Sequence, residues 1–306
     1  MRMTAATTPL SLGVALTSWR LDVAALLLVA VLGVGYARCH PRQRGPAWCF
    51  AAGLGTWLLA TSSVVAVYAP VLFWMRAVQV LMLLFVVPFL LALGRPVATV
   101  REALEEARQA QLDRLLNSRT CRVVLSPLCT SVAMLGLPWL LYLTPWYVAS
   151  MAGVVGAVTR ILLVLIGFGY FYTRLQNDPV PRRYSPMLSI GISVVESLGD
   201  GLLGLVLWLG PLIAYSYYQG LQRNWGPSLR TDQSVGAGVL WIVGDVLGVP
   251  FLAVLLRGLS KHEKKRAAEV DAELDHAPTA REDEPEAPAS GLWWEADPQL
   301  HDRFRR

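Results

Sequence analysis

The chain has 306 residues, of which 54% are apolar and only 16% are charged, and its mean hydropathy is +0.44. An ordinary soluble domain carries roughly 25% charged residues, so this chain has too little charge to cover a soluble surface of its size. Several segments are apolar over about 20 residues, the length of helix that spans a bilayer core. The composition therefore indicates an all-α, polytopic membrane protein and excludes a soluble enzyme, a secreted disulfide scaffold and a nucleic-acid binder.

Hydropathy predicts a bundle of seven membrane-spanning helices within residues 21–260. In chain order the predicted spans are Leu21–Tyr36, Trp48–Tyr68, Val71–Leu93, Val123–Leu143, Val148–Tyr172, Met187–Leu209 and Val235–Leu256. The first is short enough to resemble a signal peptide, but no small-residue cleavage pattern precedes Arg38. We therefore expect an uncleaved first helix.

The basic residues give the chain a direction in the membrane. Loops that alternate along the chain hold 17 Lys and Arg on one side and 4 on the other. Loops rich in Lys and Arg stay in the cytoplasm. We therefore expect residues 1–20 outside and the carboxyl-terminal tail inside. The net charge of +5 does not indicate nucleic-acid binding, because the basic residues flank apolar segments instead of forming a basic groove.

Two segments outside the spans, residues 101–118 and 261–306, have sequence patterns of their own. Residues 101–118 place leucines at helical spacing among charges, which predicts a helix on the inner membrane surface. Residues 261–306 form a charged tail, helical at first and then disordered where Pro, Ala and Glu dominate. Trp293 and Trp294 stand out there, either as a docking peptide or as an apolar part of a disordered tail.

Ionisable side chains lie deep within the predicted spans, where each costs about 2.5–3.5 kcal/mol unless it faces the interior of the bundle and pairs. With one amide they form a predicted buried polar cluster of Arg76, Gln79, Arg160, Glu196, Asp200 and Asp245. Two arginines against three carboxylates predict that one carboxylate is protonated. The cluster is interpreted either as an ion-pair lock between helices or as a path for protons or a ligand.

Several short motifs spread along the chain together match the pattern of one protein family. They are Trp19 with Asp22, Phe73, Gln79, Leu93–Val97, Asp178-Pro179, the element Asp232-Gln233…Trp241…Gly244-Asp245, and the tail motif Trp293-Trp294-Glu295. This set resembles the polytopic CtaG family of cytochrome c oxidase assembly factors, over about residues 16–270 and the tail motif. The closing element from Asp232 to Asp245 is the most specific part of the resemblance.

The resemblance implies a multi-pass protein of the bacterial cell membrane that assembles haem–copper oxidase, binds oxidase subunits and is linked to copper delivery. The family's third span usually carries a His-Met-x-Gln-His pattern. Here Arg76 and Val80 occupy the two histidine positions, Ala77 replaces the methionine, and Gln79 is retained. A guanidinium group stays protonated and does not bind a cation, so these positions depart from a copper site.

Sulfur is the remaining side-chain chemistry in the spans that suits copper, and Cys129 is an isolated thiol near the inner side. Met75, Met82 and Met151 are therefore weak metal candidates, although methionine in an apolar helix is usually a packing residue. No cofactor is certain, and no nucleophile–base pair indicates an enzyme. Two alternatives stay open: a scaffold without metal that holds an oxidase or another partner, and a proton-coupled transporter that uses the buried charges.

Overall fold

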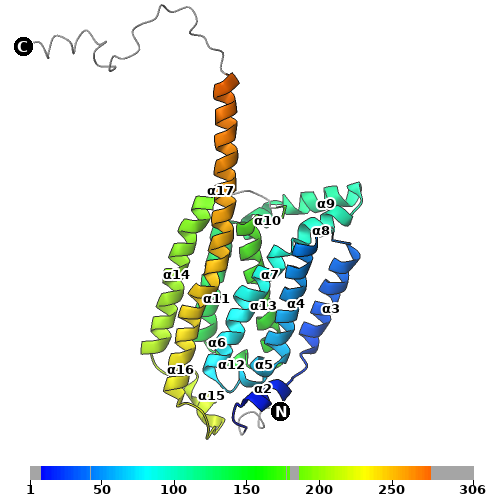
Figure 1. The fold of residues 1–306 in the computed structure, drawn as a ribbon. Coiled ribbons are helices and arrows are strands. Elements are labelled where there is room, and N and C mark those ends of the chain that lie inside the picture. The colour runs from blue at the N-terminus through cyan, green and yellow to red at the C-terminus, as the bar shows by residue number, and fades with distance from the viewer. Residues whose placement is uncertain (1–7, 42, 177, 180–185, 277–306) are drawn as a thin grey trace, which may run out of the picture. The chain divides into compact units, whose positions relative to one another are not determined.

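The computed structural model describes residues 8–41, 43–176, 178–179 and 186–276, and the regular elements of this part of the chain are all helical (Figure 1). The chain divides into two compact units, Met1–Leu259 and Ser260–Arg306. The first unit contains the polar groups considered below. The last helix, α17 (Gly244–His276), begins in the first unit and supplies the described part of the second.

Long helices run side by side in the first unit (Figure 1). They are α3 (Val23–Arg38), α4 (Arg44–Ser62), α6 (Phe73–Leu81) continued by η1 (Met82–Val86) and α7 (Val87–Leu93), α11 (Pro127–Leu143), α13 (Gly153–Leu175), α14 (Pro186–Leu209), and α16 (Leu229–Gly238) continued by η2 (Val239–Val243) and α17. Many large apolar side chains on these helices are exposed, as expected for surfaces that face lipid.

Short helices gather at the two ends of this first unit (Figure 1). One end carries α2 (Leu12–Thr17), α5 (Val64–Tyr68), α12 (Trp146–Ala149) and α15 (Tyr215–Gly220). The other end carries α8 (Pro96–Ala103), α9 (Glu106–Leu116) and α10 (Arg119–Val124). We call these the α2 end and the α9 end.

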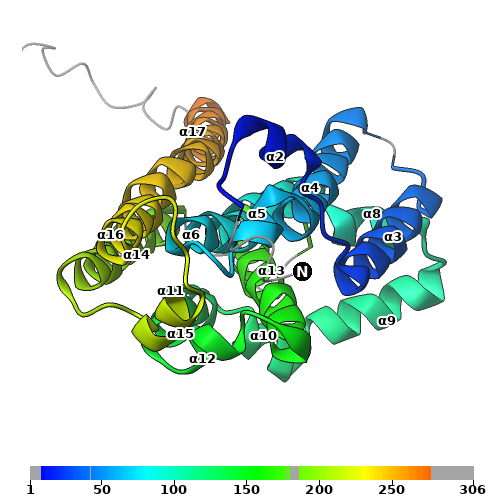
Figure 2. The same ribbon diagram turned by 90° about the horizontal axis from the view of Figure 1, so that it is seen from below.

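The segment from α6 to α7 forms the centre of the first unit. It packs against α4, α13 and α16, and the side chains of Ala77, Val80, Leu83 and Leu84 are fully buried. Viewed from the α2 end, α5, α6 and α13 lie near the middle, with α3 on one side and α14 and α16 on the other (Figure 2). This central position brings polar residues of α6 close to several helices at once.

A π-helical turn interrupts the central segment just before Pro88. Proline has no N–H and its ring crowds the carbonyl group four residues earlier, so the regular α-helical hydrogen bonding cannot continue there. Gly167 of α13 lies directly against this turn, and a Cβ atom at Gly167 would overlap the carbonyl oxygen of Leu84 and the ring of Pro88. The backbones of α13 and the central segment therefore touch at this point.

Each of the seven predicted spans is mostly helical, and the all-helical prediction is confirmed, but helix breaks at residues 125–126 and 150–152 fall inside the fourth and fifth predicted spans. Four helical segments among the described residues are long and apolar enough to cross a membrane: Arg44–Tyr68, Phe73–Ala103, Gly153–Leu175 and Leu229–Val254. Two further apolar helices, Val23–Arg38 and Pro127–Leu143, are shorter. The count of seven spans and the direction of the chain in the membrane stay predictions.

The surface helix predicted over residues 101–118 is broken in the structure. Helix α8 ends at Ala103, and Leu104 is extended before α9 begins at Glu106. Arg101 and Asp113 form an ion pair of 2.9 Å across the break, and hydrogen bonds from Arg101 hold the pKa of Asp113 below its ordinary value. Helical spacing of leucines did not reveal this break, because both pieces keep nearly the same periodicity.

The charged tail is helical as far as His276, where α17 ends. Residues 1–7 and 277–306 lie outside the described residues, and so do Trp293 and Trp294. The predicted external segment 1–20, the predicted disorder after residue 276 and the docking peptide therefore stay predictions.

Candidate functional site

The predicted polar cluster is divided into two groups in the structure. Helix α13 carries one arginine of each group: Arg160 near the α2 end and Arg174 near the α9 end. The two arginines are 14 residues apart, close to four helical turns, so they share a face and are separated by about 21 Å. The prediction of one buried polar cluster is therefore corrected, because its arginines and its carboxylates lie in two groups at different heights along α13.

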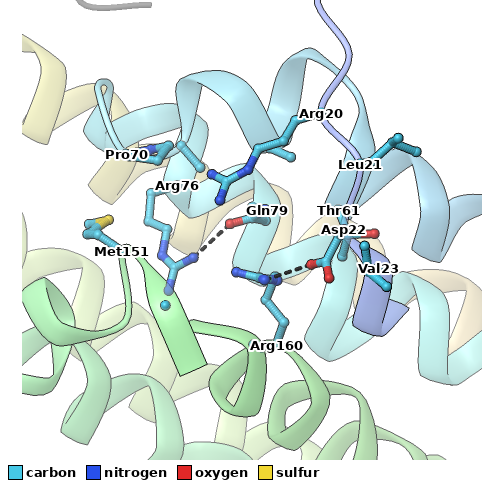
Figure 3. Close-up of a pocket in the computed structure, with 14 residues that line it drawn as sticks. Arg20, Leu21, Asp22, Val23, Thr61, Pro70, Arg76, Gln79, Met151 and Arg160 are labelled. Carbon is cyan, nitrogen blue, oxygen red and sulfur yellow. Dashed lines mark hydrogen bonds and ion pairs between the residues drawn. The ribbon is translucent and has the colours of Figure 1, made fainter. Parts of the chain in front are cut away.

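The group at the α2 end surrounds a polar cavity of about 210 Å³, which we call the arginine cavity. The ionisable and amide side chains that line it are Arg20, Asp22, Arg76, Gln79 and Arg160. Figure 3 shows the side chains of Arg20, Arg76 and Arg160 pointing toward one space around Gln79. Three cations and one carboxylate therefore face the same cavity.

Arg160 is paired with Asp22, at 2.6 Å between guanidinium nitrogen and carboxylate oxygen. Asp22 is also the N-cap of α3, and its Oδ1 accepts a hydrogen bond from the backbone N–H of Ala25 at 3.2 Å. A carboxylate at a helix N-terminus satisfies free N–H groups and interacts favourably with the helix dipole. Asp22 therefore joins α3 to α13, and both of its oxygens are engaged.

Arg76 is almost completely buried, with 2% of its surface exposed. Its guanidinium donates hydrogen bonds to Oε1 of Gln79 and to Oγ of Ser150, each at 2.7 Å. The Nε of Arg76 has no hydrogen-bond partner, and no carboxylate of the described chain lies within ion-pair distance of this side chain. Arg76 is thus a buried cation held by neutral groups.

Gln79 and Ser150 are fixed by further hydrogen bonds to the backbone. The amide of Gln79 donates to the carbonyl oxygen of Ala60 on α4 at 2.8 Å, and the hydroxyl of Ser150 donates to the carbonyl oxygen of Tyr147 at 2.7 Å. These contacts leave the oxygens of Gln79 and Ser150 turned toward Arg76. The orientation of the guanidinium is therefore set by α4, α6 and the loop before α13.

The group at the α9 end centres on Glu196 of α14. Its Oε1 forms an ion pair of 3.0 Å with Arg174, and its Oε2 accepts a hydrogen bond of 2.5 Å from the hydroxyl of Tyr170. Arg174 also donates to the hydroxyl of Ser131 on α11 and lies 4.2 Å from the centre of the Tyr170 ring. Glu196 is consequently a satisfied buried carboxylate that ties α13, α14 and α11 together.

Asp200 and Asp245 line a second, mainly apolar cavity of about 340 Å³ beside Glu196, which we call the carboxylate cavity. Asp245 accepts a hydrogen bond of 2.7 Å from the hydroxyl of Ser197. Asp200 has no ion pair or hydrogen bond within the described part of the chain. The carboxylates predicted to cluster do lie near one another, but none of them reaches Arg76 or Arg160.

Asp232 and Gln233 stabilise the ends of other helices. Asp232 lies on α16 and accepts a hydrogen bond from the backbone N–H of Trp74 at 3.1 Å, where α6 begins without a side-chain cap of its own. Arg223 neutralises Asp232 at 3.3 Å. Gln233 binds the carbonyl oxygens of Leu207 and Pro211 at 2.7 and 2.9 Å. This motif therefore fixes α6 and the end of α14 to α16.

Trp241 and Gly244 are packing residues in the described structure. The side chain of Trp241 lies against Gly201 and Gly204 of α14, where a Cβ atom would come within 3.0 Å of its Nε1 and 2.8 Å of its Cβ. Gly244 faces the side chain of Leu81 on the central segment. The family motif thus combines packing with one residue, Asp245, that faces the carboxylate cavity.

Asp178 caps helix α8 at the α9 end, as Asp232 caps helix α6. Its Oδ1 accepts a hydrogen bond from the backbone N–H of Ala98 at 2.9 Å, in the first turn of α8. Arg95 precedes α8 in a left-handed conformation and supplies no cap itself. Burial raises the pKa of Asp178 above its ordinary value, although the N–H groups of Val97 and Ala98 act in the opposite direction.

The residues of the described chain do not converge on a copper ion. Met75 packs with Tyr68 and Leu72 in a small apolar cluster, whereas Met82 and Met151 contact the main core. No group of three or more His, Cys, Asp or Glu side chains with metal-binding geometry occurs in the described ranges. Arg76 stands where the resemblance implies a histidine ligand, and a guanidinium does not bind copper.

Sequence reasoning missed several participants, among them Arg174, Asp22 and Ser150. Arg174 follows the fifth predicted span and belongs to a basic loop by composition, although its spacing of 14 residues from Arg160 is compatible with one helix face. Asp22 lies at the very start of the first predicted span, where a carboxylate can face the membrane interface and needs no partner inside the bundle. Ser150 gave no signal at all, since one hydroxyl in a short apolar segment does not indicate a partner for a buried arginine.

Comparisons with known proteins agree with the resemblance. Uncharacterized proteins of Mycobacterium leprae, Mycobacterium bovis and Mycobacterium tuberculosis are each 24% identical to this chain over 276 or 277 residues. The matches cover 85% of this chain and 42% of each relative, so the chain spans less than half the length of these relatives. No solved structure matches the chain significantly. The sequence model of the cytochrome c oxidase caa3 assembly factor family matches residues 28–262, more than half of the chain, and the chain belongs to this family.

Proposed function

We propose that this protein is a membrane-embedded scaffold that supports assembly of cytochrome c oxidase without delivering copper itself. Family membership supports the role in assembly. The observation that favours a scaffold is Arg76, a buried guanidinium held by Gln79 and Ser150 at the position where the resemblance implies a metal ligand. A fixed positive charge there repels a metal cation.

A deletion strain tests this proposal. Loss of the gene should lower the oxidase-specific haem absorbance and oxygen uptake, while other respiratory complexes remain assembled. Copper added to the medium bypasses a missing copper carrier but does not replace a scaffold, so added copper should leave the defect in place. Recovery with copper would refute the scaffold, and normal oxidase in the deletion strain would refute the role in assembly.

We also propose that the chain crosses the bacterial cell membrane seven times, with its amino terminus outside. The distribution of Lys and Arg supports this direction. In a variant whose four cysteines are replaced by serine, a cysteine at the exposed position Gln219 should react with an impermeant reagent in intact cells. A cysteine at the exposed position Glu106 is the matched control and should react only after permeabilisation. The reverse pattern would overturn the orientation.

The pair of tryptophans in the tail suggests a docking role only through its amino-acid composition. We propose that Trp293 and Trp294 bind an oxidase subunit, since large aromatic residues often anchor protein interfaces. Replacement of both by alanine should lower oxidase content while the amount of this protein in the membrane stays unchanged. Unchanged oxidase content would contradict docking.

A second candidate function, proton-coupled transport, is favoured by Asp200. This carboxyl group lines the carboxylate cavity without a partner in the described chain, and unpaired intramembrane carboxyl groups often carry protons. Asp200→Asn removes the titratable group with little change in size. If transport is the function, this variant should abolish proton uptake in proteoliposomes and should also fail to complement the deletion strain; full complementation would exclude it.

A further inference from the structure

We propose that the arginine cavity binds an oxyanion, namely a phosphate or carboxylate group. Its ionisable lining consists of Arg20, Arg76 and Arg160 against Asp22, which leaves an excess of two positive charges around about 210 Å³. A buried positive charge is costly unless an anion or several hydrogen bonds compensate it. This proposal goes beyond the role in oxidase assembly and does not depend on it.

Asp22 does not neutralise the cavity as a whole. Its two oxygens are occupied by Arg160 and by the N–H of Ala25, so it balances one arginine only. Arg76 has neutral partners, and Arg20 forms no ion pair with any described residue. Two guanidinium groups therefore remain available for an anion.

Arg76 is the strongest single indication of a ligand. This side chain is 2% exposed, lines the cavity and keeps its Nε without a partner. Gln79 and Ser150 hold the guanidinium in a fixed orientation before any ligand arrives. Planar guanidinium groups with fixed orientation are well suited to bind the oxygens of carboxylates and phosphates.

The start of helix α13 adds to the positive field. Gly153 is its first residue and lines the cavity, and its N-cap, Ala152, makes no side-chain hydrogen bond. The neighbouring helices α3 and α6 begin at the same end but are capped by Asp22 and Asp232. The unsatisfied N–H groups at the start of a long helix favour an anion nearby.

The anion could come from solution or from a lipid headgroup, and both present the same oxygens. Full-length protein in dodecyl maltoside, at an ionic strength held constant with chloride, separates these sources. One arm titrates inorganic phosphate or acetate by calorimetry and thermal unfolding. The other arm adds phosphatidylglycerol in a buffer that contains neither inorganic phosphate nor acetate. Saturable binding and a higher Tm are expected in at least one arm, and competition between the arms would show that both sources use one site.

The variants locate the binding in the cavity. Arg20→Gln, at an exposed mouth residue that need not disturb folding, should weaken binding at least fivefold. Arg76→Gln should weaken it more than tenfold, and Arg76→Lys should give an intermediate loss because it keeps the charge without the planar fork. Arg119→Gln, at an exposed arginine of α10, is the matched control and should change nothing. Absence of binding in both arms, or equal binding by Arg20→Gln and the parent protein, would overturn the proposal.

Discussion

The arginine cavity and the group around Glu196 both bury charged side chains, but their net charges have opposite signs. In the arginine cavity the cations exceed the carboxylates by two, and Arg76 relies on an amide and a hydroxyl. In the other group Arg174 pairs with Glu196, and Asp200 and Asp245 line the cavity beside Glu196, so among the described residues the carboxylates exceed the cation by two when all are ionised. The two ends of one helix, α13, therefore carry imbalances of opposite sign.

These imbalances do not cancel each other through space. At about 21 Å and an effective dielectric constant near 20, two unit charges interact by less than about 1 kcal/mol. The contacts within each group, at 2.6 and 3.0 Å, are much stronger. Each group must therefore be balanced locally, by hydrogen bonds, by protonation or by a bound ion. A charge count over the whole membrane domain does not show this need for local balance, because it adds the two opposite imbalances together.

The largest effect is expected at the α9 end. Arg174→Leu leaves Glu196 buried with only the hydroxyl of Tyr170, so we expect it to destabilise the protein by about 3–5 kcal/mol. Glu196→Gln in the same chain should recover part of the loss. Chemical unfolding in detergent measures both, and a double-mutant cycle gives the coupling energy. The control Arg114→Leu removes an exposed arginine of α9 and should cost little.

A smaller effect is expected at the α2 end, and it tests the separation of the groups. Arg160→Leu should cost about 1–3 kcal/mol, less than a fully buried pair, because 18% of the Arg160 side chain is exposed. Asp22→Asn should restore part of this loss while it keeps an N-cap for α3. Asp200→Asn should restore none. Equal rescue by Asp200→Asn would show that the two groups are coupled after all.

The smallest effect is expected at Asp178, outside both groups. Asp178→Ala removes the acceptor at the start of α8 and should cost about 1 kcal/mol, whereas Asp178→Asn keeps an acceptor oxygen and should cost less.

The raised pKa of Asp178 adds a dependence on pH. The folded protein binds this proton more tightly than the unfolded chain, so the stabilisation is complete below the ordinary pKa of about 3.9 and is lost as the pH rises through the folded value. The parent protein should therefore gain stability relative to Asp178→Asn as the pH is lowered toward about 4. Thermal unfolding of both proteins over this range measures the difference, and a constant difference would contradict the raised pKa.

The sequence was sufficient to predict where helices form and which residues are costly to bury. Long apolar windows located the helices, and the insertion cost of charges singled out Arg76, Arg160 and Glu196. Each of these observations depends on local composition, so no knowledge of neighbouring helices was needed.

Pairing could not be predicted in the same way, because it depends on which helices are neighbours and at what height their residues meet. The Arg160–Asp22 and Arg174–Glu196 pairs join positions 138 and 22 residues apart in the sequence. The roles of Asp178 and Asp232 as caps of other helices were equally hidden. A cap supplied from a distant segment leaves no periodic signal near the helix that it stabilises.

The contact between Gly167 and the π-helical turn has a consequence for movement. Because a Cβ atom at this point would overlap Leu84 and Pro88, the contact fits only a residue without a side chain. A slide of α13 by one turn, about 5.4 Å, would bring Leu163 or Phe171 to the same place, and neither fits. The register of α13 is therefore locked near its middle, and the helix can tilt about this point but cannot act as a piston.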